Sequence, residues 1–164
     1  MSWAALIVGV VVVERIAELL LSRRNTRLLL RMGGHEAGRE HYPLIVMLHL
    51  AWLIAVYAAA PRGAAPIWWL IAIYLALQGM RYWAIATLGY YWTTRIVNVP
   101  RAPLVKAGPY RFMRHPNYAV VVAEIAILPL AFREPRVAAI CSLLNLLLLA
   151  WRIRVENRAL DSRR

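Results

Sequence analysis

The sequence predicts an all-α, polytopic integral membrane protein with five transmembrane helices. Of its 164 residues, 62% are hydrophobic and 17% are charged, and the mean hydropathy is +0.53. An ordinary soluble domain is roughly 45–50% apolar, and it has no place to bury so large an apolar surface. The apolar residues also fall into five separate stretches, and the basic residues gather beside only some of their ends.

Each of the five stretches has the composition of a membrane span, for which about 20 apolar residues are needed. Residues 2–21, 43–60 and 66–88 are predicted to cross the bilayer in turn. Residues 118–132 and 136–151 are shorter and reach only about 22–24 Å as helices, so we expect a thin hairpin there. The first stretch lacks a basic leader and a clear cleavage site, so we expect it to be retained. We expect the whole chain to form a single domain.

The basic residues predict the orientation, because cytosolic loops of membrane proteins carry an excess of Lys and Arg. The chain has 20 basic and 8 acidic residues, a net charge of +12. Fifteen of the basic residues follow the first, third and fifth spans: Arg23, Arg24, Arg27, Arg31, Arg39, Arg95, Arg101, Lys106, Arg111, Arg114, Arg152, Arg154, Arg158, Arg163 and Arg164. Three lie on the other side: Arg62, Arg133 and Arg136. This predicts an outer N-terminus, a cytosolic C-terminus and a site facing the cytosol.

Polar residues inside the predicted spans share one depth. By helical rise, Glu14, His49, Arg81, Glu124 and Asn145 each lie about 9–11 Å from the cytosolic end of a span. Ionisable groups inside a membrane are costly unless they are paired or hydrated. Two interpretations follow: a buried polar tie in which Arg81 neutralises Glu14 or Glu124, or the floor of a cavity open to the cytosol. In the second interpretation, Glu14, His49, Arg81 and Glu124 line a substrate cavity.

Residues 104–118 join a turn to the predicted fourth span. Gly108 permits a positive φ or a close approach to a ligand. Pro116 suits the first turn of a helix. Free amides at that helix start, beside Arg114 and His115, would make an anion-binding pocket at the membrane surface. The alternative is a basic loop that rests on anionic lipid.

Several other site types are not expected. The net charge would suit a nucleic-acid binder, but the long apolar runs argue against such a partner. The single cysteine, Cys141, excludes a disulfide framework and a cysteine metal site. The segment HEAGREH at residues 35–41 has Arg39 where a zinc helix needs its second histidine, so we expect no metal. A nucleotide-binding GxGxxG, a P-loop and a GxSxG nucleophile turn are absent from the sequence.

The segment GPYRFMRHPNY at residues 108–118 resembles the signature of the isoprenylcysteine carboxyl methyltransferase family, integral-membrane enzymes that use S-adenosylmethionine. The family pairs this segment with a C-terminal R(x)nEE pattern, whose place is taken here by Arg152–Leu160, with Asn157 at the second acidic position. Residues 14–18, 38–42 and 88–92 are similar to a compact bacterial branch. That branch is associated with O-methylation of alkylpyrones and alkylresorcinols.

The resemblance implies a cofactor site formed by residues 104–118 and 152–160. Its cofactor contacts would come from Val105, Lys106, Gly108, Tyr110, His115, Tyr118, Glu156 and Asn157. The resemblance also implies catalytic roles for Arg114, which would hold an anionic acceptor near the methyl group, and for His115.

The resemblance thus implies an S-adenosylmethionine-dependent O-methyltransferase acting on a lipophilic acceptor, an alkylpyrone or alkylresorcinol hydroxyl. A resorcinol hydroxyl, with a pKa near 10, would benefit from a base, for which His115, His49 and His41 are candidates. One alternative is carboxyl methylation of a prenylated acceptor. A second alternative is a small proton-coupled exporter, since such proteins place a lone carboxylate in the first helix, as Glu14 is placed here. A third is a scaffold without catalysis. The expected partners are the lipophilic or prenylated acceptor and membrane lipid.

Overall fold

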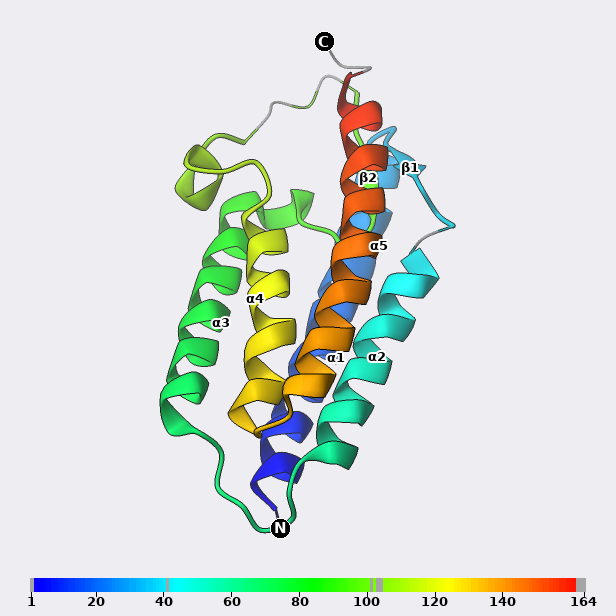
Figure 1. The fold of residues 1–164 in the computed structure, drawn as a ribbon. Coiled ribbons are helices and arrows are strands. Elements are labelled where there is room, and N and C mark those ends of the chain that lie inside the picture. The colour runs from blue at the N-terminus through cyan, green and yellow to red at the C-terminus, as the bar shows by residue number, and fades with distance from the viewer. Residues whose placement is uncertain (1, 41, 101, 103–104, 162–164) are drawn as a thin grey trace.

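A computed structural model describes residues 2–40, 42–100, 102 and 105–161, with the side chains of 157 and 159–161 outside the description. Most of these residues form five long helices: α1 (Trp3–Arg31), α2 (Tyr42–Ala59), α3 (Trp68–Leu88), α4 (Pro116–Ala131) and α5 (Pro135–Asp161). The helices lie side by side in a bundle, and the start of α1 and the last turns of α5 lie at opposite ends of it (Figure 1). The predicted helical class is confirmed, and a helix lies at each of the five predicted spans.

The helices α1 and α5 continue about ten residues beyond the apolar stretches predicted for them, to Arg31 and Asp161. An apolar run ends where polar residues begin, whereas a helix ends where its backbone hydrogen bonds end. At the end of α1, Gly33 adopts a φ of +82° and its amide donates to the carbonyl oxygen of Leu30 at 3.1 Å. A left-handed glycine of this kind is a common helix stop.

Two helices in the described part of the chain are long and apolar enough to cross a membrane: Tyr42–Ala59 and Pro135–Glu156. The helix Pro116–Ala131 is apolar but shorter. Five membrane crossings and an outer N-terminus therefore remain predictions. The bundle does place the segments around β1 (His35–Ala37) and η2 (Gly108–Arg111) at the same end as the last turns of α5 (Figure 1), as the predicted topology requires.

A small antiparallel sheet corrects the all-α expectation. Its strands β1 (His35–Ala37) and β2 (Ile96–Asn98) pair with Glu36 opposite Val97. Three residues are too few to show the alternation that identifies a strand in a sequence. The sheet joins the segment after α1 to the segment after α3, and the Nη1 atom of Arg95 donates to Glu36 Oε1 at 2.6 Å.

The hydrophobic core lies in the half of the bundle that holds the N-terminal end. Trp52 of α2 is 2% exposed, and its Nε1 donates to the carbonyl oxygen of Ile125 in α4 at 3.2 Å. Val56 of α2 and Leu128 of α4 are fully buried beside it. The cavity described below lies toward the other end of the bundle from this closely packed core.

Candidate functional site

A cavity of about 500 Å³ lies in the half of the bundle opposite the core. All five long helices contribute side chains to its wall, together with residues 91–98, Tyr110, Arg114 and His115. Much of the wall is apolar, including Val12 of α1, Leu53 of α2 and Leu148 of α5. Polar side chains form its two ends and are described in turn below.

The wall residues that remain exposed show where the cavity opens. Ile16 of α1 is 52% exposed and Leu50 of α2 is 58% exposed, although both line the cavity. Arg114, just before α4, is the third exposed wall residue in the described part of the chain. The cavity wall therefore reaches the surface at two places, called here the apolar opening (Ile16 of α1 and Leu50 of α2) and the basic opening (Arg114).

Tyr118, in the first turn of α4, joins the basic end of the cavity to α5. Its hydroxyl donates to Glu156 Oε2 and accepts from Arg152 Nε at 2.7 Å. The rings of His115 and Tyr118 stack with their centroids 5.0 Å apart, and His115 Nδ1 lies 3.8 Å from Glu156 Oε2. Two segments that are far apart in the sequence thus meet at one point, as the sequence predicts. Pro116 begins α4, also as predicted.

Arg152 lies in the predicted cofactor region 152–160, but the sequence predicts no contact for its own side chain. It is 7% exposed, lines the cavity, and donates from Nη2 to the carbonyl oxygen of Thr94 at 2.8 Å. Thr94 in turn shares a hydrogen bond of 2.7 Å with the hydroxyl of Ser22. One signal was available: Arg152 and Glu156 are four residues apart on a helix, which places them on one face.

The predicted cofactor contacts divide into two groups. Tyr110, His115, Tyr118 and Glu156 line the cavity, as does the predicted catalytic Arg114, whereas Val105, Lys106 and Gly108 do not. The side chain of Asn157 and the whole of His41 lie outside the described residues.

Packing explains the glycine at position 108, in place of the expected contact with a ligand. Its φ is +52°, and a Cβ atom there would lie 2.5 Å from Thr87 Oγ1 of α3. The glycine therefore lets the 3-10 helix η2 (Gly108–Arg111) pack against α3. A motif places residues near one another along the chain, but packing decides which of them face the cavity.

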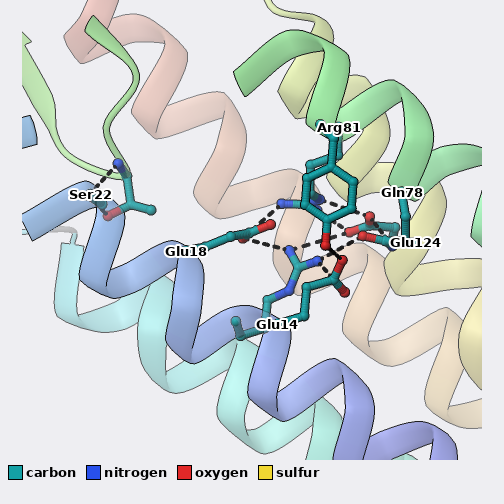
Figure 2. Close-up of polar contacts among 9 residues, drawn as sticks. Glu14, Glu18, Ser22, Gln78, Arg81 and Glu124 are labelled. Carbon is teal, nitrogen blue, oxygen red and sulfur yellow. Dashed lines mark hydrogen bonds and ion pairs between the residues drawn. The ribbon is translucent and has the colours of Figure 1, made fainter. Parts of the chain in front are cut away.

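An ion network closes the other end of the cavity. Arg81 of α3 is 3% exposed, and its Nε donates to Glu124 Oε1 of α4 at 3.0 Å, with a second, shorter contact between Nη2 and Oε2. Its Nη1 lies 3.4 Å from Glu18 Oε2 of α1. Figure 2 shows these side chains turned toward one another from three helices. The predicted pairing of Arg81 with Glu124 is confirmed.

Arg15 of α1 extends the network. Its Nη1 lies 3.0 Å from Glu18 Oε2, and its Nη2 donates to Gln78 Oε1 at 3.0 Å. Gln78 donates from Nε2 to Glu124 Oε1 at 2.6 Å. Glu14 accepts from Arg15 Nη2 at 3.2 Å and from the hydroxyl of Tyr82.

Both interpretations of the polar layer therefore hold, for different residues. His49, Arg81 and Asn145 line the cavity, together with Glu18 of the same layer. The expected cavity residues Glu14 and Glu124 do not line it; their carboxylates pair with Arg15 and Arg81. The polar tie thus forms the floor beneath the cavity.

The cavity wall can hold a polar ligand. Asn117 Oδ1 and Asn145 Nδ2 are buried with no hydrogen-bond partner in the described part of the chain, and both residues line the cavity. Burial, and secondly the negative charge of Glu156, raise the pKa of Tyr110 to about 12. Its hydroxyl therefore remains a hydrogen-bond donor at neutral pH.

A helical bundle with an apolar opening, a basic opening and a shared cavity has the features of a membrane enzyme that brings a lipophilic molecule to a water-soluble one. The chain belongs to the isoprenylcysteine carboxyl methyltransferase family, whose profile matches residues 69–162. It is therefore a membrane methyltransferase, in a family whose members are embedded in membranes and generally use S-adenosylmethionine. Membership favours the enzyme over the exporter and the scaffold.

Relatives with curated sequences extend this similarity to nearly the whole chain. The uncharacterized protein YpbQ of Bacillus subtilis is 39% identical over 165 residues, which cover 98% of this chain and 97% of the relative. An uncharacterized protein of Haemophilus influenzae is 25% identical over 154 residues, covering 90% of this chain and 88% of the relative. No solved structure matches the chain.

The residues at the basic end fit the cofactor of this family. S-adenosylmethionine carries an ammonium group, a carboxylate, hydroxyls and an adenine ring. The carboxylate of Glu156 complements a cation, the Tyr110 hydroxyl is a donor, and the unpartnered Asn117 Oδ1 is an acceptor. The donor and acceptor set in this part of the wall is thus suited to that molecule.

Proposed function

We propose that the protein transfers a methyl group from S-adenosylmethionine to an oxygen atom of a lipophilic acceptor, an alkylpyrone or alkylresorcinol hydroxyl. The observation that carries this proposal is the pair of openings on one cavity. A water-soluble cofactor would enter at Arg114, and a lipid-soluble acceptor would enter between α1 and α2, past Ile16 and Leu50. Carboxyl methylation of a prenylated acceptor is the alternative within the family.

Glu156, Tyr118, His115, Tyr110 and Asn117 would hold the cofactor, which supplies an electrophilic methyl group on a positively charged sulfur. Glu156 would accept a hydrogen bond from the amino group. Arg152 holds Tyr118, and Tyr118 holds Glu156, so the carboxylate is oriented before a ligand arrives.

Arg114 would hold the acceptor oxygen. Its guanidinium lines the cavity and forms no ion pair with any other described residue, so it is available for an anionic oxygen. The apolar wall excludes water from that oxygen, and the shape of the cavity aligns it with the methyl carbon. Alignment and exclusion of water are the main requirements of such an in-line displacement.

We further propose a location in a bacterial plasma membrane, with the basic opening facing the cytosol. The excess of basic residues at that end of the bundle supports this orientation. Membrane lipid would surround the apolar opening, and residues 1–164 would act as a single domain.

The proposal is tested by methyl transfer from labelled S-adenosylmethionine, using the purified full-length protein in lipid nanodiscs. The acceptors are a long-chain hydroxypyrone, a long-chain resorcinol and a farnesylcysteine analogue. We expect label in the pyrone or resorcinol product. Label in the farnesylcysteine ester alone would show the alternative acceptor class, and no binding of S-adenosylmethionine would refute the methyltransferase.

Replacing Glu156 by glutamine is expected to weaken the binding of S-adenosylmethionine about tenfold or more, because a charge-assisted hydrogen bond would be lost. Isothermal titration calorimetry measures the change. Glu134→Gln is the matched control and should leave the affinity unchanged, because Glu134 lies between α4 and α5, whose connecting turn is at the other end of the bundle (Figure 1). An unaltered affinity in Glu156→Gln would remove the assigned role.

A further inference from the structure

The floor of the cavity is a second polar region, separate from the cluster around Tyr118. Arg15, Glu18, Arg81 and Asn145 line it. On α5, Asn145 precedes Glu156 by about three helical turns, or about 16 Å along the helix axis. A ligand group at the floor would therefore be distinct from a group bound at Glu156.

Three buried atoms at this floor have no hydrogen-bond partner in the described part of the chain: Glu18 Oε1, Asn145 Nδ2 and Arg15 Nε. Glu18 is only 7% exposed and Asn145 only 4%. The first atom is an acceptor that lacks a donor, and the other two are donors that lack an acceptor. Because buried polar groups are ordinarily hydrogen-bonded, the floor is complementary to a ligand with one donor and at least one acceptor oxygen.

The charges at the floor favour a neutral ligand. The network contains the guanidinium groups of Arg15 and Arg81 and the carboxylates of Glu14, Glu18 and Glu124. When all of them are ionised, the network has an excess of one negative charge. A hydroxyl is therefore a better match for Glu18 Oε1 than a carboxylate.

The apolar opening lies at the level of this floor. Ile16 is in the same helical turn as Glu18, and Leu50 follows the wall residue His49 on α2. A ligand that passes between these two exposed side chains would meet Glu18 and Asn145 while its alkyl chain remained among apolar residues.

We propose that Glu18 and Asn145 bind the polar ring of the methyl acceptor and select a neutral ring that carries a hydroxyl and a second oxygen. One hydroxyl donates to Glu18 Oε1 and its oxygen accepts from Asn145 Nδ2, which leaves the second ring oxygen free for Arg114 and the methyl group. The alkyl chain extends toward Ile16 and Leu50. This inference rests on the proposed function and deepens it, because it favours a hydroxylated ring over a prenylcysteine carboxylate.

Equilibrium binding without turnover tests the site. The probes are a long-chain alkylresorcinol and its dimethyl ether, which keeps the oxygen acceptors but has no O–H donor. We expect the wild-type protein in nanodiscs to bind the resorcinol at least tenfold more tightly than the ether. Glu18→Gln should remove most of this preference, because only the affinity for the resorcinol falls. Asn145→Leu should lower the affinity for both probes.

Ser142→Ala is the matched control, because Ser142 Oγ is also a buried, unpartnered atom on α5 but does not line the cavity. It should leave both affinities unchanged. If Asn145→Leu does not fold, Asn145→Ser provides the same comparison. Glu18→Gln is also titrated with S-adenosylmethionine, whose affinity should stay within twofold of the wild type.

Two results would overturn the proposed ring site: equal wild-type affinities for the two probes, or an equal loss of both affinities in Glu18→Gln. The latter is what a purely structural role of Glu18 predicts. Binding of S-adenosylmethionine to the wild type distinguishes a failure of the ring site from a failure of the proposed methyltransferase activity. If it binds but the probes are not distinguished, only the ring site fails, and if it does not bind, the proposed methyltransferase activity fails.

Discussion

Replacing Arg114 by alanine is expected to lower kcat/KM for methyl transfer by about 100- to 1,000-fold while leaving the affinity for S-adenosylmethionine unchanged. Removing one group that stabilises charge at a reacting oxygen has effects of this size. Arg114 lines the basic opening and forms no ion pair with another described residue, so its loss should not disturb the fold. Single-turnover methyl transfer and calorimetry separate the two effects.

Arg111→Ala is the matched control for Arg114→Ala. Arg111 precedes Arg114 by less than one helical turn and is also exposed, but it does not line the cavity. It should retain nearly full activity. Arg114→Lys should recover part of the rate, because it keeps the charge but not the two-pronged geometry of a guanidinium. Turnover in Arg114→Ala equal to that of Arg111→Ala would exclude an acceptor-binding role.

Replacing Arg81 by methionine is expected to lower the free energy of unfolding by about 3–5 kcal/mol. Arg81 and Glu124 are 3% exposed, and the substitution would leave the carboxylates of Glu124 and Glu18 with only Arg15 to neutralise them. Unfolding of the detergent-solubilised protein, followed by tryptophan fluorescence in denaturant, measures the change.

Arg39→Met is the control for this prediction. The Arg39 side chain is 73% exposed and pairs with Glu36 at 3.0 Å, so its loss should change the unfolding free energy by less than about 1 kcal/mol. Combining Arg81→Met with Glu124→Gln should recover part of the loss, because the unpaired charge is removed. Equal stabilities of the Arg81 and Arg39 variants would show that the buried network contributes little to folding.

The approximate positions of the five helices were predictable because each coincides with an apolar stretch bounded by polar residues. Their full lengths were not, since Gly33 and other local stops depend on backbone conformation. The meeting of Tyr118 with Glu156 was also predictable, because both segments carry residues typical of one family. The contacts of the Arg152 side chain were not predictable, since composition does not distinguish a buried arginine from a lipid-facing one.

A helical fold, the isoprenylcysteine carboxyl methyltransferase family and the two segments of the polar end could all be inferred from the amino-acid sequence. Apolar stretches and short motifs are local properties, so they are visible along the chain. Which polar residues face the cavity depends on the packing of the folded chain. Glu18 and Asn145 line it while Glu14 and Glu124 are tied beneath it, because side-chain direction depends on how three or more helices pack together.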